Sequence, residues 1–401
     1  MSELNITKYY PFMRTKITEQ SIYGQNPDSA LIKLMPDLRY RPICHICGQP
    51  AATVHSQGYR RYIRDLNMAG ARVWLQVGYR KIWCYDCQGV RVERLSFAHA
   101  SQRVTHRLAR YIYDLCKVMT VKEVAGHLDL DPKTVKQIDK EYLEEEFGGT
   151  DTDNLRVLMI DEIAMRKGHR YMTVVADYFS GRVIWMGANR DKKTLGKFFA
   201  TMTQKQKKAI EAVAMDMWEP FINRVKHHCP NARIVFDFFH IVQSFSKVID
   251  KVRSDEYRKA TDAERKVLKG SRYLLLKNDE NLTHTQRNRL EAVLELNSTL
   301  SALYILKDQL KMIYYYGERA KVKQVLDEWC EMAKQIAHYS VQGFIKRLMF
   351  FEYGILNHAD YPIGTSRLEG INNKIKVIKR KAYGFHDEEY FALKVKQAFV
   401  A

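Results

Sequence analysis

The chain has 401 residues, of which 46% are hydrophobic and 11% aromatic, which is enough apolar surface for a folded core and excludes a disordered protein. At roughly 150 residues per domain, the length allows two or three domains. Lysine and arginine number 65 against 46 aspartates and glutamates, a formal net charge of +19. This excess indicates a polyanionic partner, nucleic acid first and an anionic membrane surface second, with a basic surface kept only for solubility as the alternative.

No stretch approaches the ~18 apolar residues that a membrane-spanning helix needs. Residues 1–10 carry Glu3 and Lys8 and lack the apolar region of a secretion signal, so we expect a cytoplasmic protein. Four of the seven cysteines fall in two Cys-x-x-Cys pairs. In a reducing compartment, this pattern favours metal binding over disulfides.

The two cysteine pairs predict one structural zinc site near the N-terminus. Each pair can direct two thiolates at one tetrahedral ion, and the ligands would be Cys44, Cys47, Cys84 and Cys87. Four unlinked thiols, or a redox pair, are the alternatives, but two matched pairs favour zinc. Residues 48–83 would then form a long hairpin with the pairs at its base, as in a zinc ribbon.

The hairpin is indicated by Arg60–Asp65 and by apolar residues that alternate from Val73 to Tyr79, with a turn at Ala69-Gly70. Six cations lie between the cysteine pairs: Arg60, Arg61, Arg64, Arg72, Arg80 and Lys81. They are compatible with contact to nucleic acid, and a purely structural zinc module is the alternative.

Three helices are predicted to follow. A capping box of Thr120 and Glu123 begins the second helix, Val121–Leu128. Asp131 can cap the third helix, with Pro132 at its first position, where the missing N–H costs nothing. The apolar side chains expected between the helices are Leu108, Ile112, Leu115, Val124, Leu128, Val135 and Ile138.

A short helix, a tight turn and a further helix form the helix-turn-helix pattern. The third helix would enter the major groove of DNA and present Lys133, Thr134, Lys136 and Gln137. An ordinary helical hairpin inside a larger core is the alternative, and the neighbouring zinc module and basic charge weigh against it.

From Leu155 onward, short apolar strands end in acids: Val157–Ile160 before Asp161, Ala212–Met215 before Asp216, and Ile234–Phe236 before Asp237. A hairpin around Ser180-Gly181 and helices over 191–203 and 218–229 complete the pattern. The order strand, strand, strand, helix, strand, helix, strand is that of a mixed, ribonuclease-H-like sheet flanked by helices.

In that order the first and fourth strands are neighbours, so Asp161 and Asp216 would lie together at their ends. Two close carboxylates repel each other, which raises the pKa of at least one of them. Divalent cations relieve the repulsion by taking oxygen ligands from both. Two Mg²⁺ or Mn²⁺ ions, roughly 4 Å apart, can activate the attacking oxygen and stabilise the leaving oxygen of a phosphodiester.

A third carboxylate is expected from a later helix that begins near Ser366, and Glu369 is the candidate. The apolar face of this helix would be Leu368, Ile371, Ile375 and Ile378. Ser366 and Glu369 also fit a capping box, which alone would explain the glutamate. Catalysis is favoured because five cations suited to a DNA backbone lie on and after the helix: Lys374, Lys376, Lys379, Arg380 and Lys381. A solvated helix end is the alternative for these cations.

Taken together, four motifs make the chain resemble the ISL-three group of bacterial insertion-sequence transposases, within the DDE/RNase H-like superfamily, over nearly its whole length. The motifs are Ile160 to Glu162, Ala214 to Pro220, Phe236 to His240 and Ser366 to Asn373. The resemblance implies a transposase that binds transposon ends and catalyses metal-dependent strand cleavage and strand transfer. It implies Asp161, Asp216 and Glu369 as the catalytic triad and Asp237 and His240 as an accessory pair.

Two of these assignments have alternatives. Asp237 also ends a strand and could be mistaken for the second catalytic aspartate, although strand order places it one strand too far. His240 could orient DNA or a carboxylate, or could be a helix histidine without a catalytic role.

The predicted architecture is a multidomain α/β protein: a zinc-ribbon DNA-binding module over 1–100, a helix-turn-helix over 101–150, a ribonuclease-H-like core over 151–242, an all-helical insertion over 243–362, and the last part of the core over 363–401. The insertion could clamp DNA or serve as a scaffold that places Glu369. Its Trp329 and Tyr314-Tyr315-Tyr316 are expected in the core.

The expected cofactors are one structural Zn²⁺ ion and two Mg²⁺ or Mn²⁺ ions. The expected partners are double-stranded DNA, as terminal inverted repeats and target, and further copies of the chain in a dimeric or higher synaptic complex. No membrane partner is expected, and the protein should lie with the bacterial nucleoid.

Two rival functions stay open at this point. A DNA-binding regulator without chemistry leaves Asp161, Asp216 and Glu369 unexplained. A structure-specific nuclease or resolvase on the same fold would use the same acids and metals. An assay of cutting and joining of labelled DNA ends distinguishes the three functions. A transposase cuts and joins, a nuclease cuts without joining, and a regulator does neither.

Overall fold

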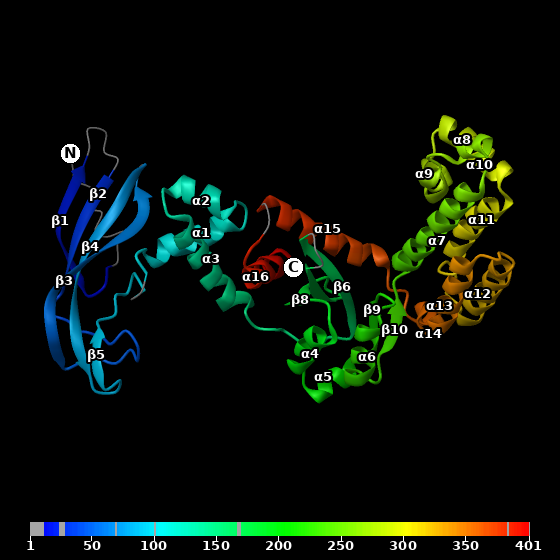
Figure 1. The fold of residues 1–401 in the computed structure, drawn as a ribbon. Helices are drawn as coiled ribbons and strands as arrows, with labels where there is room; N and C mark the ends of the chain where they lie inside the picture. The colour runs from blue at the N-terminus through cyan, green and yellow to red at the C-terminus, as the bar shows by residue number, and fades with distance from the viewer. Residues whose placement is uncertain are drawn as a thin grey trace. The chain divides into compact units, whose positions relative to one another are not determined.

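The computed structural model describes residues 12–23, 29–68, 70–99, 102–166, 170–382 and 385–400. The chain forms two compact units, Met1–Glu145 and Glu146–Ala401, and Figure 1 colours them along the sequence. Among the described residues, no helix combines the length and the apolar character that crossing a membrane requires.

The first unit opens with a five-stranded sheet. Its strands are β1 (Thr15–Tyr23), β2 (Ser29–Pro36), β3 (Thr53–Met68), β4 (Ala71–Cys84) and β5 (Gly89–Val92). Their order is β1-β2-β4-β3, with β5 paired to β4 (Figure 1). The predicted hairpin is confirmed, since β3 and β4 pair antiparallel, and both strands extend beyond the predicted segments. Ala69 of the predicted turn lies outside the described residues, whereas Gly70 has a φ of +85°, which glycine adopts readily.

Three helices follow: α1 (His106–Cys116), α2 (Val121–Leu128) and α3 (Pro132–Phe147). The predicted capping box is confirmed, because the Thr120 hydroxyl accepts from the Glu123 N–H while the Glu123 carboxylate accepts from the Thr120 N–H. The Asp131 carboxylate caps α3 by accepting from the N–H groups of Lys133 and Thr134 at 2.8 and 3.3 Å. All seven predicted apolar side chains pack in one cluster, Leu115 at its margin.

The second unit contains a five-stranded mixed sheet. Its strands are β6 (Val157–Arg166), β7 (Arg170–Asp177), β8 (Val183–Ala188), β9 (Ala212–Met215) and β10 (Arg233–Phe236), in the order β10-β9-β6-β7-β8. Strands β9 and β10 run parallel to β6, and β7 runs antiparallel to both β6 and β8. The first and fourth strands of this unit, β6 and β9, are neighbours in the sheet, so their predicted adjacency is confirmed.

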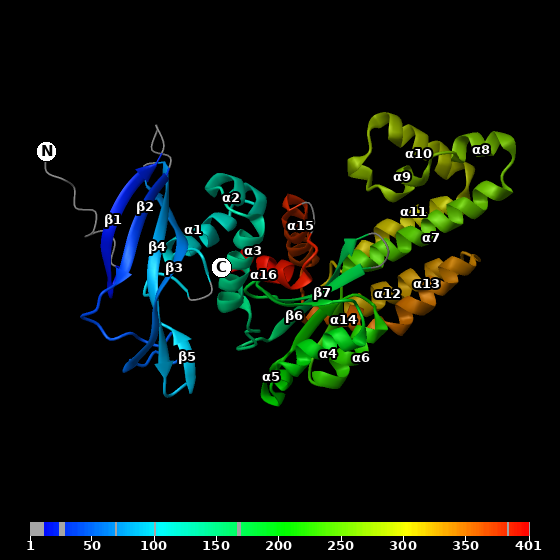
Figure 2. The same cartoon turned by 60° about the vertical axis from the view of Figure 1, so that its left-hand side comes forward.

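Helices cover both faces of this sheet (Figures 1 and 2). Between the strands lie α4 (Lys192–Ala200), α5 (Gln204–Ala209) and α6 (Glu219–His228). Alternate residues of β6 point to opposite sides, so Leu158 packs with α4 and α6 in one core, whereas Met159 packs with Leu368 of α15 (Thr365–Lys381) in the other. The chain ends with α16 (Glu388–Ala398), on the α15 side.

A long helical segment separates β10 from α15. It comprises α7 (Phe238–Lys259), α8 (Asp262–Leu268), α9 (Arg272–Leu276), the short η2 (Asp279–Asn281), α10 (His284–Leu296), α11 (Ser298–Met312), α12 (Arg319–Lys334), α13 (Tyr339–Phe350) and α14 (Glu352–Asp360). The predicted helical run from Leu290 to Leu306 is broken at Asn297, whose side chain caps α11 by accepting from the Leu300 N–H. Trp329 is 1% exposed and donates to the Leu306 carbonyl, so its predicted place in the core is confirmed. The same prediction is wrong for Tyr315, which is 78% exposed.

Candidate active site and metal centres

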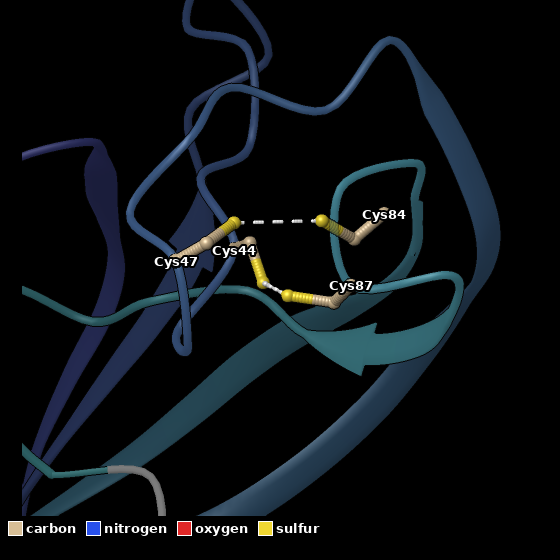
Figure 3. A group of neighbouring side chains, drawn as sticks. All are labelled: Cys44, Cys47, Cys84 and Cys87. Carbon is tan, nitrogen blue, oxygen red and sulfur yellow. Dashed lines mark hydrogen bonds between the residues drawn. The ribbon is translucent and has the colours of Figure 1, made fainter.

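The four paired cysteines converge at the base of the β3–β4 hairpin (Figure 3). The sulfur atoms of Cys44 and Cys87 are 3.9 Å apart, and those of Cys47 and Cys84 are 3.5 Å apart. A tetrahedral zinc with Zn–S bonds of about 2.3 Å would separate its sulfurs by about 3.8 Å, whereas a disulfide needs about 2.0 Å. The cluster thus has the dimensions of a four-cysteine metal site.

The turns that carry the cysteines bring the four thiols close together. Gly48, at a φ of +73°, closes the first turn by donating to the Cys44 carbonyl, and Cys84 ends β4 just before the turn into β5. Burial opposes ionisation of Cys44, but the N–H groups of Cys47 and Ile46 lower its pKa to about 7. Burial and the neighbouring sulfurs raise the pKa of Cys87 to about 12. Without a cation, Cys44 and Cys87 therefore do not ionise over the same pH range, and a bound cation would favour the thiolate form of both.

A second group lies at one edge of the sheet of the second unit. Ligand atoms of Asp161 on β6, Asp216 after β9 and His240 on α7 lie within 4.8 Å of one another. The parallel pairing of β6 with β9 brings the two aspartates together where that pairing ends, so their predicted proximity is confirmed. The predicted end of the first strand at Ile160 is wrong, because β6 continues through Asp161 to Arg166 in its pairing with β7. His240 arrives there because α7 begins directly after β10, the next strand of the sheet.

The electrostatics of this group favour a cation. Asp161 is 8% exposed, and burial together with the Asp216 charge raises its pKa to about 6. Two donors face its carboxylate, the Glu162 N–H at 2.7 Å and the Asn372 side-chain amide. Burial opposes protonation of His240, but its 2.8 Å contact with Asp216 and the surrounding acids raise its pKa overall.

Asp237 has a different role from the two aspartates in the close group. Strand β10 pairs with β9, and β6 lies on the other side of β9. The Asp237 carboxylate caps α7 by accepting from the Phe239 N–H at 2.8 Å, and it lies 3.9 Å from His240. Burial raises its pKa, with smaller contributions from the charges of Asp216 and Glu369.

Glu369 lies on α15, exposed, and does not belong to the close group of ligand atoms in the described residues. The alternative capping box is not formed, because the N-cap of α15 is Gly364 and Ser366 lies inside the helix. The side chain of Ser366 is outside the described residues. One turn after Glu369, Asn372 is the residue of α15 that contacts Asp161.

The residues predicted to contact DNA differ in their surroundings. Lys374 donates to the Ala398 carbonyl and Lys379 to the Ala164 carbonyl at 2.8 Å, while Lys376 and Arg380 are exposed. On α3, Lys133 and Gln137 are exposed, and Thr134 and Lys136 are half-buried.

Sequence reasoning missed two features beside the site. Asn372 is one. It lies three residues after Glu369, and residues at this spacing share one face of a helix, so the sequence did contain a signal for it. The other is Arg190, which lies 3.3 Å from Glu162 and over the rings of Tyr171 and Trp218 at 4.4 and 5.2 Å. No local pattern marks Arg190, because its contacts come from three separate segments.

Family profiles and named proteins match this chain over most of its length. A family profile described as "Transposase", of the DDE type in family ISL3, matches residues 158–395, and one described as "Helix-turn-helix domain of transposase family ISL3" matches residues 93–143. The transposase for insertion sequence element IS1001 from Bordetella parapertussis is 39% identical over 360 residues, which is 89% of this chain and 88% of that protein. The transposase for IS1557 from two strains of Mycobacterium tuberculosis is 30% identical over 260 residues, covering 59% of this chain and 58% of those proteins. The chain therefore belongs to the ISL3 family of insertion-sequence transposases, enzymes that cleave DNA and transfer its strands.

Proposed function

We propose that this transposase cuts and joins DNA at the group formed by Asp161, Asp216 and His240, with Glu369 as the third acid. The observation that carries the proposal is the convergence of two aspartates from adjacent parallel strands, Asp161 within β6 and Asp216 directly after β9. The order of strands and helices supports a ribonuclease-H-like core over 151–242 and 363–401, interrupted by a helical insertion over 243–362.

Asp161 and Asp216 would hold the cations, two Mg²⁺ or Mn²⁺ ions, because hard cations prefer carboxylate oxygens to imidazole nitrogen. The ions would supply Lewis-acid activation of a phosphodiester. His240 and Asp237 act as the accessory pair. His240 orients the Asp216 carboxylate through their 2.8 Å contact, and Asp237 fixes the start of the helix that carries His240.

Cleavage and joining of labelled element ends in Mg²⁺ test this assignment. Asp161→Asn, Asp216→Asn and Glu369→Gln should each lower activity by several orders of magnitude, because a metal site fails as a unit. Asp237→Asn should be milder, since an asparagine can still cap α7. If Asp237→Asn abolishes activity while Asp216→Asn retains it, the second acid has been assigned to the wrong strand. Activity retained by Glu369→Gln would remove Glu369 from the triad.

The N-terminal segments are proposed to bind the DNA ends: the four-cysteine module over 1–100 around one structural Zn²⁺, and the helix-turn-helix over 101–150. Residues Lys133, Thr134, Lys136 and Gln137 would contact the major groove, and Lys374, Lys376, Lys379 and Arg380 the backbone near the active site. Bringing two ends together would require a homodimer or a higher oligomer in the synaptic complex.

Replacing Lys133 and Lys136 together with alanine should weaken binding of element-end DNA by the full chain. It should also make binding less sensitive to salt, since each lost phosphate contact reduces the salt slope by about one. The matched control is Lys205→Ala with Lys208→Ala. These two lysines are exposed and lie three residues apart on α5, in the second unit. Titrations by fluorescence anisotropy at several salt concentrations measure both quantities. Equal loss in both double variants would argue against a specific role for α3.

A further inference from the structure

Asn372 has an unusual environment on α15. Its side-chain nitrogen donates to Oδ2 of Asp161, across 211 positions of sequence. The oxygen of the same amide is buried and has no hydrogen-bond partner among the described residues. Buried polar atoms are nearly always satisfied, so this amide is unusual in being held through its nitrogen, at Asp161, and not through its oxygen.

The orientation of the amide follows from charge. An ionised carboxylate only accepts hydrogen bonds, so the amide of Asn372 must turn its N–H toward Asp161. Leu368, Ile371 and Ile375 are buried against the sheet and hold α15, and with it Asn372, in this register.

We propose that Asn372 is a positioning residue of the cation site, holding the carboxylate of Asp161 in place with its amide nitrogen. This inference rests on the proposed function, in which Asp161 and Asp216 bind the cation. Partners around the direct ligands of a metal ion orient those ligands. The neighbouring Asn373 is exposed and supplies the natural comparison.

Mn²⁺ binding to the zinc-loaded full chain, measured by titration calorimetry without DNA, tests the proposal independently of activity. Asn372→Ala should weaken Mn²⁺ binding by about 10- to 100-fold, the range found when partners of metal ligands are removed. Asn373→Ala should leave it within about twofold. Asn372→Gln, which keeps the amide on a longer side chain, should recover part of the loss.

Circular dichroism establishes that each variant is folded, and Asn372→Ser replaces Asn372→Ala if the latter is not. Wild-type Mn²⁺ affinity in a folded Asn372→Ala or Asn372→Ser chain overturns the proposal. Asp161→Asn is the reference. If it abolishes Mn²⁺ binding while the Asn372 variants bind Mn²⁺ as tightly as wild type, only the role of Asn372 fails. If Asp161→Asn also binds normally, the proposed cation site itself is wrong, and the role of Asn372 falls with it.

Discussion

At the scale of single residues, the surroundings of Asp161 oppose its ionisation. Asp161 is buried beside a second acid, and its partners are the Glu162 N–H and the Asn372 amide. Neither partner carries a positive charge, so much of the repulsion between the aspartates remains. Perturbed carboxylates of this kind are typical of functional sites, where a bound cation supplies the missing charge.

The raised pKa of Asp161 predicts how stability depends on pH in the absence of divalent cations. Its value of about 6 in the folded chain lies above the ordinary 3.8, so the fold favours the protonated carboxyl. This group therefore contributes its full stabilisation below about pH 4, and the stabilisation is lost as the pH rises through 6. The free energy of unfolding falls by about 3 kcal/mol by pH 8 for this reason.

Asp161→Asn should therefore raise the free energy of unfolding in cation-free buffer at pH 8 and change it little at pH 4. Denaturant unfolding at both pH values measures the difference. Asp262→Asn, at an aspartate whose side chain is 95% exposed, is the control and should have little effect at either pH. Equal stability of wild type and Asp161→Asn at pH 8 would contradict the prediction.

At the scale of elements, polar contacts tie the helices of the long segment to one another. Lys307 on α11 is 2% exposed, and its ammonium donates to the carbonyls of Leu275 and Lys277 at 2.9 and 2.6 Å. Those carbonyls lie at the C-terminal end of α9, where helical carbonyls lack partners within the helix. Burial lowers the pKa of Lys307 to about 8.

Lys307→Met should lower the free energy of unfolding by about 1–3 kcal/mol, because methionine fills the space but leaves two carbonyls without their donor. Lys311→Met, one turn later on the same helix, is the matched control. Lys311 is more exposed and bonds only to side chains, those of Asn278 and Asp308, so its loss should matter less. Thermal unfolding compares the two. A neutral Lys307→Met would mean that desolvation of the ammonium cancels its hydrogen bonds.

At the scale of the whole molecule, the two compact units have separate cores. The first contains a cluster between α1, α2 and α3, a second on the sheet, and a third around the cysteines. A unit with its own apolar clusters is expected to fold by itself.

A fragment of residues 1–150 should fold cooperatively and contain one zinc per chain by metal analysis. Cys44→Ser or Cys84→Ser should lose the metal and much of the stability, because the ion holds the base of the hairpin together. Cys116→Ser is the control: this cysteine is buried in the helical cluster away from the four-cysteine site, so zinc should be retained. A fragment that folds fully without metal would show that the site is not structural.

Much of the fold was predictable because its signals are local. The capping residues Thr120 and Asp131 act within three positions of themselves, and the two Cys-x-x-Cys pairs mark their own turns. Runs of apolar residues followed by acids predicted three strands of the second sheet and the adjacency of Asp161 with Asp216, and the hairpin around Ser180-Gly181 predicted the other two. Strands β1 and β2 were not predicted, because most of their side chains are only partly buried or exposed and their apolar pattern is weak.

The sequence by itself determined the family, the order of the strands in the second unit and the proximity of Asp161 and Asp216, whereas the structure showed that β6 continues beyond Asp161. Only the tertiary structure decided that His240 contacts Asp216, that Asp237 caps a helix beside the site, and that Asn372 rather than Glu369 touches Asp161. The physical reason is distance along the chain. Local patterns specify turns, caps and buried faces, whereas side-chain contacts across many residues depend on how helices pack against the sheet, and no nearby sequence signal encodes that packing.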